Sequence, residues 1–239
     1  MLSLPDKYKK GSRIPLSPFL NGTLTTAEKK RFKETVEGIQ IVYQIEGFDI
    51  PNLINDDYNC QVIAFLEVKL TNLKNAAFVA KIIQKQVKTL CVIKLTDGKE
   101  ECYSFANKRL NKQNKNEIIV EDVFITDTLP LNFSNSAKTL FSLYIDYETI
   151  LNRNNKHSYY MEMMTKAFLV FNQELYSGTI GLLDSKLWYD DEKIAECYFA
   201  ISSLRQLKLK AAKTTAVSER GEINKQIKTT IQQLEDLMK

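Results

Sequence analysis

The stretch Gln61-Val-Ile-Ala-Phe-Leu-Glu-Val-Lys-Leu70 decides the fold, together with the segment that continues from it to Arg109. Residues 62–70 are apolar except at Glu67 and Lys69. This run is long enough for a strand but too short for a typical helix. It predicts a central strand that is covered on most of both its faces.

Two further patterns follow this strand. Residues 75–87 carry apolar side chains at the spacing of one helical stripe, namely Phe78, Val79, Ile82, Ile83 and Val87. The β-rich runs 89–95 and 101–105 then flank Asp97-Gly98. Because Asp-Gly between two such runs is a strong hairpin signal, the centre is predicted to be a strand, a helix and a hairpin.

The segments on either side of this centre add one helix and two strands. Thr25 and Glu28 have the spacing of a capping box, at the start of a helix that ends near Gly38. Residues 39–45 and 117–125 are rich in β-branched and aromatic side chains. The sequence thus predicts an α+β fold, with an N-terminal mixed or mostly antiparallel sheet and two packed helices.

The C-terminal part is predicted to be a helical region that ends in a helical hairpin or a short coiled coil. Apolar side chains recur at helical spacing within residues 136–151, 160–176 and 192–213. The last helix carries a seam of a and d positions, formed by Ile223, Ile227, Leu234 and Leu237. This seam either folds back on the preceding helix or binds a partner. The partner would be another protein or a second copy of this chain.

These patterns divide the chain into three segments. Residues 1–24 hold three of the five prolines and several basic side chains, and we expect them to form a basic extended arm. Residues 25–130 are expected to form an α/β domain. Residues 131–239 are expected to form the helical region.

The composition is that of an ordinary folded protein with a slight excess of positive charge. The 239 residues include 33 basic and 29 acidic side chains, which gives a net charge of +4. His157 is the one histidine and no Cys-x-x-Cys pair is present, so the pattern does not predict a zinc site. No run approaches the ~20 apolar residues of a membrane span. We therefore expect four unpaired cysteines in the reducing cytoplasm, no membrane association and no cofactor.

One constellation of residues predicts catalytic chemistry. Asp56 and Asp57 precede the central strand, on which Glu67 and Lys69 share one face. Restriction-type nucleases hold Mg²⁺ with an acidic residue and a Glu-x-Lys strand, whose lysine lies beside the attacking water. A Mg²⁺-dependent nuclease that uses Asp57, Glu67 and Lys69 is therefore one hypothesis. The alternative is a structural ion pair of Glu67 and Lys69 with each other or with a helix above the sheet.

Basic side chains gather in two places. The candidate nucleic-acid-binding residues of the arm and first helix are Lys9, Lys10, Arg13, Lys29, Lys30 and Lys33. A second cluster, with no acidic residue among its members, consists of Arg205, Lys208, Lys210 and Lys213. Such clusters can neutralise phosphates and bind nucleic acid without sequence preference. A solvated surface is the alternative interpretation of both.

The order of these features resembles DUF4391, a bacterial family catalogued as a domain of unknown function. The motifs that carry the resemblance span nearly the whole chain: Lys29-Lys-Arg-Phe32, Ile-x-x-x-Tyr-x-Ile over 39–45, Val-x-x-Phe-x-x-x-x-Leu over 62–70, Ile83-Gln-Lys85 leading to Gly98-Lys99, and the final helix 219–239. The resemblance implies a gene beside helicases and DNA methyltransferases in anti-phage, restriction-like clusters. It implies no catalytic residues, and the position of Lys69 does not stay lysine in the family.

From this resemblance we expect a non-catalytic accessory or interaction subunit of a bacterial DNA-processing system. A neighbouring helicase or DNA methyltransferase would be its partner, and the basic surface would contact DNA. The Mg²⁺-dependent nuclease is the competing hypothesis, and it alone requires a metal. A homodimer through the last helix is a third.

Overall fold

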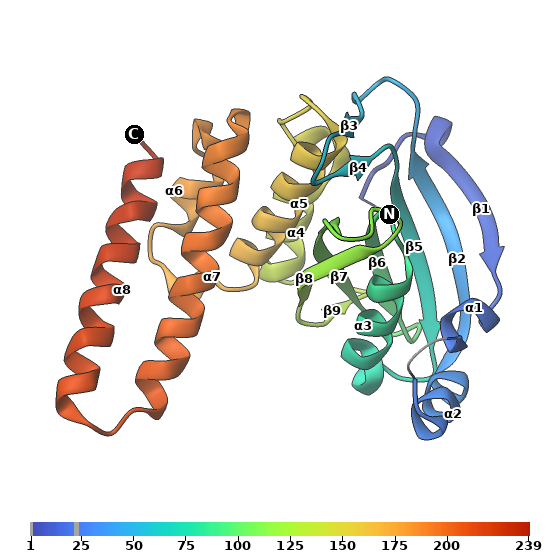
Figure 1. Ribbon diagram of the computed structural model, residues 1–239, viewed down its shortest axis with the longest axis horizontal. Helices are drawn as coiled ribbons and strands as arrows, with labels where there is room; N and C mark the ends of the chain where they lie inside the picture. Colours follow the sequence, from blue (N-terminus) through green and yellow to red (C-terminus); the bar gives the residue numbers. More distant parts are fainter. Residues whose placement is uncertain (1, 22–23) are drawn as a thin grey trace.

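Seven strands form a mixed β-sheet, and the α+β fold expected from the sequence is confirmed (Figure 1). The computed structural model describes residues 2–21 and 24–239. The strands follow the spatial order β1 (Lys9–Ile14), β2 (Val36–Ile45), β5 (Ile63–Leu70), β6 (Leu90–Thr96), β7 (Glu100–Leu110) and β8 (Ile118–Ile125), and β9 (Leu129–Pro130) pairs with β7. A separate ribbon of two strands, β3 (Leu53–Ile54) and β4 (Asn59–Cys60), lies between β2 and β5 in the sequence.

Strands β5 and β6 are parallel, whereas the other neighbouring strands of the sheet run antiparallel. A parallel pair needs a crossover connection, and helix α3 (Ala76–Gln86) supplies it. Gly98 lies in the hairpin between β6 and β7 with φ +84°. Glycine adopts this left-handed conformation without steric cost. The predicted order of strand, helix and hairpin is thus confirmed.

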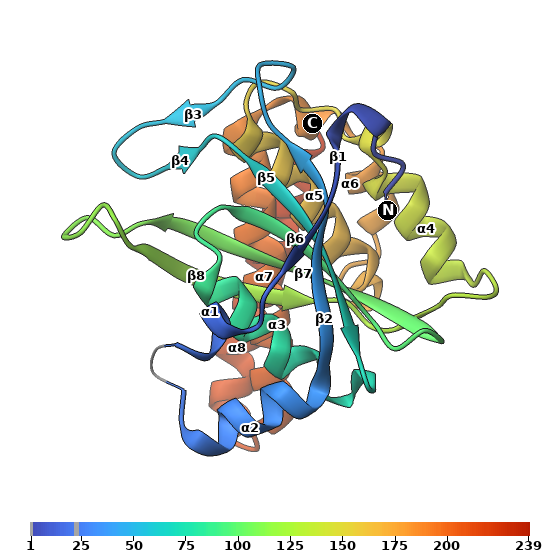
Figure 2. The same ribbon diagram turned by 90° about the vertical axis from the view of Figure 1, so that its right-hand side faces the viewer.

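Helices cover both faces of the sheet, as Figure 2 shows with α3 in front of it and α5 and α7 behind. The α-helices are α1 (Ser17–Leu20), α2 (Thr26–Thr35), α3, α4 (Ser136–Ile145), α5 (Lys156–Val170), α6 (Thr179–Leu183), α7 (Asp191–Lys213) and α8 (Val217–Leu237). Short 3₁₀ helices span Asp6–Tyr8, Leu73–Asn75, Tyr147–Thr149, Gln173–Leu175 and Lys186–Tyr189. Among the described residues, no helix combines the length and the apolar character needed to cross a membrane.

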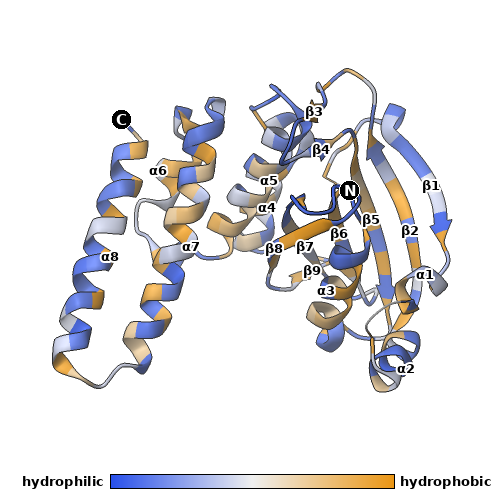
Figure 3. Ribbon diagram, in the orientation of Figure 1, coloured by the Kyte–Doolittle hydropathy of each residue, from blue (hydrophilic) through white to orange (hydrophobic). Residues whose placement is uncertain are grey.

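Strand β5, which Figure 3 colours by hydropathy, has a different apolar cluster packed against each of its faces. Leu66 and Val68 belong to the cluster that includes residues of α2 and α3. Ile63 and Phe65 belong to the larger cluster that includes residues of α4, α5 and α7. A strand covered in this way carries a nearly continuous apolar run, which is the pattern seen in the sequence.

The N-terminal segment belongs to the folded body and is not a free arm. Its residues Lys9–Ile14 form β1, the edge strand that pairs antiparallel with β2. Leu4 and Tyr8 are buried in the larger apolar cluster. Three residues of the expected arm, Met1, Gly22 and Thr23, lie outside the described part of the chain.

The expected boundary after Pro130 separates the strands from the helices but does not separate two cores. The last strand of the sheet is Leu129–Pro130, and α4 begins at Ser136. The larger cluster nevertheless joins Phe105 of β7 to Tyr159 of α5 and Trp188. The helical region therefore packs directly on the sheet.

The sheet opens between β6 and β7, and side chains complete the backbone hydrogen bonds. The regular pairing of these strands ends at Ile93 and Ser104. Beyond it, the Tyr160 hydroxyl of α5 accepts a hydrogen bond from the Ala106 N–H at 2.7 Å and lies 3.1 Å from the Cys91 carbonyl oxygen. Tyr160 thus replaces the direct bond between the two strands.

Two further polar side chains fill the same opening. Gln84 of α3 donates from the opposite face to the Cys91 and Ser104 carbonyl oxygens, both at 3.2 Å. The Lys108 ammonium donates to the Val87 and Thr89 carbonyl oxygens at 2.8 and 3.1 Å. Burial lowers the pKa of Lys108. Buried backbone groups need such partners, since an unsatisfied one is costly.

Replacement of Tyr160 by phenylalanine should lower the free energy of unfolding by about 1–3 kcal/mol, because it leaves a buried amide without its acceptor. Urea denaturation of both proteins measures the difference. The matched control is Tyr189→Phe, since Tyr189 is 61% exposed and its change should stay within about 0.5 kcal/mol. Equal losses in the two variants would contradict this role of Tyr160.

Candidate functional site

Glu67 and Lys69 lie at the end of β5, in a polar part of the face that α4 and α5 cover elsewhere. Glu67 pairs with Lys94 of β6 at 3.4 Å, and Lys94 also pairs with Glu101 of β7 at 3.1 Å. Burial would lower the pKa of Lys94, but Glu101 and Glu67 together raise it. The negative charge of Glu67 is therefore neutralised by Lys94, a residue that the sequence pattern did not identify.

This ion pair is part of a polar row that crosses five strands. The strand register makes Arg13, Gln40, Glu67, Lys94 and Tyr103 successive neighbours from β1 to β7. Directly opposed residues of neighbouring strands share one face of the sheet. A shallow cavity of about 70 Å³ lies beside the row and is lined by Arg13, Gln40, Glu67 and Lys69, among others. The row can hold ions or hydrogen-bonding groups at the surface of the sheet.

Asp56 and Asp57 lie elsewhere, in the turn between β3 and β4. Asp56 pairs with Lys115 at 2.6 Å, and Asp57 pairs with Lys112 at 3.3 Å. These two ion pairs attach the β3–β4 turn to the loop between β7 and β8. The pKa of Asp56 is lowered by its hydrogen bond with Lys115.

The structure does not bring Asp57 and Glu67 together. The Asp57 carbonyl oxygen accepts a hydrogen bond from the Leu110 N–H, at the far end of β7 from Tyr103. Tyr103 is the strand neighbour of Lys94, which pairs with Glu67. The part of β7 between Tyr103 and Leu110 spans roughly 20 Å, at about 3.3 Å per residue. Ligands of one Mg²⁺ ion each lie within about 2.1 Å of it. Among the described residues, no group of three His, Cys, Asp or Glu side chains is placed to hold a metal ion.

The six basic residues predicted to contact nucleic acid are divided between two elements. Lys9, Lys10 and Arg13 lie on the edge strand β1, and Lys10 pairs with Glu46. Lys29, Lys30 and Lys33 lie on α2, where Lys30 pairs with Glu34 at 3.8 Å. The first group therefore lies on a strand of the sheet rather than on an extended arm, and the second lies on the helix expected from the sequence.

The predicted seam of the last helix is occupied within the chain. Helix α8 packs antiparallel along α7, as the hairpin in Figure 1 shows. Leu234 and Leu237 lie in the same apolar cluster as Ile201 of α7, and Ile227 packs against that cluster. Ile223 is also buried. Of the two alternatives in the sequence, the seam thus folds back on the preceding helix.

The outer half of this hairpin is strongly basic. We call residues 205–228 the hairpin tip. Its acidic residues are Glu219 and Glu222, and its basic residues are Arg205, Lys208, Lys210, Lys213, Arg220, Lys225 and Lys228. The tip therefore carries a net charge of +5, against +4 for the whole chain. Lys208 is half-buried and the other six basic residues are exposed.

The inner half of the hairpin presents apolar surface to solvent. Phe199 of α7 is 62% exposed. It borders a groove of about 480 Å³ between α7 and α8, lined by Glu196, Phe199, Ala200, Ser203, Gln233 and Leu237. A long helix normally turns its large apolar residues toward the core, so Phe199 is a candidate contact for another protein.

The remaining candidate residues occupy ordinary structural positions or stand alone. Cys60, Cys91, Cys102 and Cys197 are free and buried, as expected. Burial raises the pKa of Cys60, Cys102 and Cys197 to about 12 in each case, so these thiols are poor nucleophiles. His157 lies in the first turn of α5, with its ring centroid 4.1 Å from that of Tyr58.

Comparison with known proteins identifies the family but not the activity. The family model described as a domain of unknown function, DUF4391, matches residues 2–234. The chain therefore belongs to this family. No match was found among curated proteins or among solved structures.

The pH dependence of stability should report the burial of His157. Burial lowers its pKa from 6.5 to about 4, while Asp191 acts in the opposite direction. Between these values the unfolded chain binds the proton more strongly, so protonation favours unfolding and stability falls as the pH falls. From pH 6.5 to 4, wild type should lose about 2–3 kcal/mol more than His157→Gln. Chemical denaturation at several pH values measures this, and parallel pH profiles would contradict it.

Proposed function

We propose that the protein is a non-catalytic accessory subunit of a bacterial DNA-processing system of the anti-phage, restriction-like kind. It acts in the cytoplasm, docks to a larger helicase or DNA methyltransferase subunit, and contacts DNA. The observation that carries this proposal is the hairpin of α7 and α8, which extends away from the sheet and bears a tip of net charge +5. The genetic setting implied by the family resemblance gives the kind of system.

The hairpin tip suits the phosphate backbone of DNA. Seven basic side chains on two adjacent helices create one region of positive electrostatic potential. Within this region Lys210 forms an ion pair with Glu219 at 3.1 Å. Lysine and arginine that neutralise phosphates release counter-ions, so affinity falls steeply with salt and depends little on base sequence. An accessory subunit needs only this kind of contact, because its partner supplies the chemistry.

Docking to the larger subunit is assigned to the inner half of the hairpin. Phe199 and the groove between α7 and α8 offer exposed apolar surface there. Aromatic residues that fill pockets dominate the energy of protein interfaces. A homodimer through Ile223, Leu234 and their neighbours would require α8 to leave α7, because these residues already lie in the buried seam.

Removal of charge from the tip should weaken DNA binding. The variant carries Lys213→Gln, Lys225→Gln and Lys228→Gln, at three exposed positions. Each lost phosphate contact should reduce the slope of log affinity against log salt by about 0.9. Fluorescence anisotropy with a labelled duplex, at several salt concentrations, measures both affinity and slope.

The matched control removes the same number of charges from α2, by Lys29→Gln, Lys30→Gln and Lys33→Gln. This variant should bind DNA as wild type does. If it loses as much affinity as the tip variant, binding follows net charge rather than the hairpin. If only the α2 variant is affected, the DNA surface lies on that helix and the tip is excluded.

Docking is tested by Phe199→Asp, which places a charge on the apolar groove. A pull-down from the native host, with nuclease treatment and mass spectrometry, should recover a helicase or methyltransferase with wild type and lose it with the variant. Val217→Asp is the control, since Val217 is 86% exposed at the start of α8. Circular dichroism checks that both variants fold. Recovery of wild type alone, without a partner, would contradict the proposal.

A further inference from the structure

Helix α3 presents a stripe of lysines to solvent. Its apolar face packs in the cluster that also includes residues of α2. Lys81 and Lys85 on the helix, with Lys74 before it and Lys88 after it, are exposed. We call these four residues the α3 stripe. Among the described residues, none of the four forms an ion pair, and the sequence from 71 to 89 contains no acidic residue.

Positive charge is concentrated in the α3 stripe and in the hairpin tip. The stripe carries +4 and the tip +5, whereas the whole chain carries +4. The residues outside these two segments therefore have a net charge of −5. A surface that serves only solubility usually intersperses both signs of charge. Two separate surfaces of one sign, on a chain that is acidic elsewhere, indicate an anionic partner for each.

The stability of α3 does not account for the stripe. The helix dipole favours cations at the C-terminal end, which explains Lys85 and Lys88 but not Lys74 at the N-terminal end. Lys81 and Lys85 are four residues apart, and Lys85 and Lys88 are three apart. Like charges at these spacings destabilise a helix. An anion bound along the stripe would remove this repulsion.

The α3 stripe and the hairpin tip lie on different sides of the sheet. Figure 2 shows α3 in front of the sheet and α7 behind it. The edge strand β8 lies between them, because α3 packs on it and Tyr198 of α7 donates a hydrogen bond to its Asp122.

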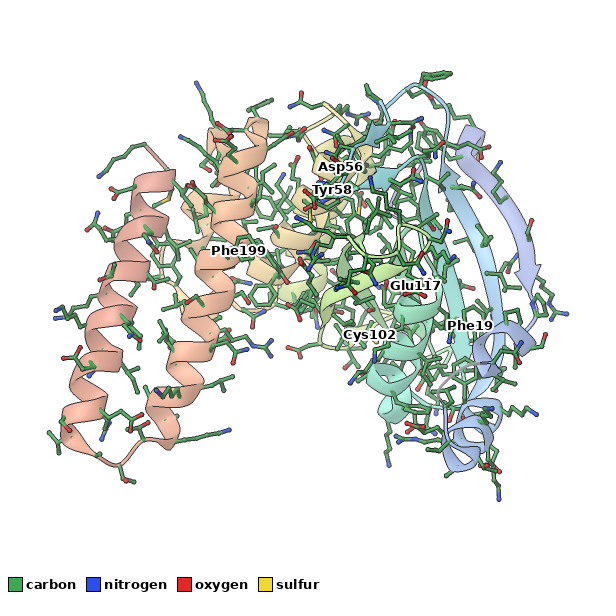
Figure 4. All side chains as sticks on the ribbon, viewed as in Figure 1. Phe19, Asp56, Tyr58, Cys102, Glu117 and Phe199 are labelled. Carbon is green, nitrogen blue, oxygen red and sulfur yellow. The ribbon has the colours of Figure 1, made fainter. Side chains whose placement is uncertain are left out.

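This edge strand is acidic. Strand β8 contains Glu121 and Asp122 and no basic residue. Glu117, labelled in Figure 4, directly precedes it. A phosphate backbone that crossed from the stripe to the tip would meet these like charges. The two basic surfaces are therefore suited to two separate anions rather than to one.

We propose that the α3 stripe is a second surface for the phosphate backbone of DNA, so that one protein molecule holds two DNA segments at once. The proposal takes its ligand from the proposed function and adds a bridging activity. Lysine contacts to phosphate position a protein on DNA without reading its sequence. Helix α2 is not part of the surface, because it mixes Glu28 and Glu34 with its basic residues.

The number of DNA duplexes bound per protein provides the first test. The stripe variant carries Lys74→Gln, Lys81→Gln and Lys85→Gln, at exposed positions. Isothermal titration calorimetry of the full chain with a short duplex at low salt should give two duplexes for wild type. The stripe variant and the tip variant should each bind one. A single duplex on wild type, or two on the stripe variant, would overturn the proposal.

Bridging itself is measured with one duplex fixed to beads and a second, labelled duplex in solution. Wild type should retain the labelled duplex on the beads, and both the stripe variant and the tip variant should lose it. The matched control is the α2 variant, which removes the same charge from the neighbouring helix and should bridge as wild type does. Bridging that persists in the stripe variant would mean that two copies of the chain join two tips, and would overturn the proposal.

Lysine acetylation, mapped by mass spectrometry, locates the second duplex. In the tip variant, DNA should protect Lys81 and Lys85 from acetylation and leave Lys29 reactive. Equal protection of Lys29 would show that binding follows net charge and would overturn the assignment to α3. Circular dichroism checks that each variant folds.

The same variants separate this proposal from the proposed function. If the tip variant loses affinity and the stripe variant binds as wild type does, the second surface is excluded and the role of the tip stands. If only the stripe variant loses affinity, DNA lies on α3, and both the role of the tip and the bridging are excluded. Absence of DNA binding by wild type overturns both proposals.

Discussion

The opening between β6 and β7 is the constraint on which the arrangement of the helices depends. Two strands that separate inside a protein leave backbone groups that must find partners. Tyr160 bonds to these groups from one face of the sheet and Gln84 from the other. Lys108, on β7 itself, donates to the Val87 carbonyl oxygen. Helices α5 and α3 are therefore fixed to the sheet by hydrogen bonds of defined geometry as well as by apolar packing.

Helix α5, once fixed to the sheet, also fixes the positions of the helices and loops that pack against it. It is almost wholly buried, and its charged side chains are satisfied by neighbouring loops and by each other. The Lys156 ammonium donates to the Gly47 and Ile50 carbonyl oxygens, and Glu162 pairs with Lys166 at 2.5 Å. A buried charge without its partner is strongly destabilising. The loops that contact α5 are thereby fixed, and α7 packs against a rigid surface.

The sequence predicted the central fold well because local rules agree with the tertiary structure there. The apolar run of β5, the stripe of α3, the Asp97-Gly98 turn and the capping box at Thr25 each have one low-energy solution. Strand β1 was missed because its exposed basic residues lack an apolar alternation. The Glu67–Lys94 pair depends on residues distant in the sequence, and local patterns cannot reveal it.

The distribution of charge along the α7–α8 hairpin is not explained by helix stability alone. The helix dipole favours acids at the start of α7 and lysines at its end, which accounts for Asp191, Glu192 and Lys213. It does not favour Arg220, the fourth residue of α8, and it does not reach Lys225, the ninth. Both lie across the turn from the basic end of α7. Like charges brought together across a turn oppose folding of the hairpin. A polyanion such as DNA would remove that repulsion, so DNA binding and the stability of the tip are expected to be coupled.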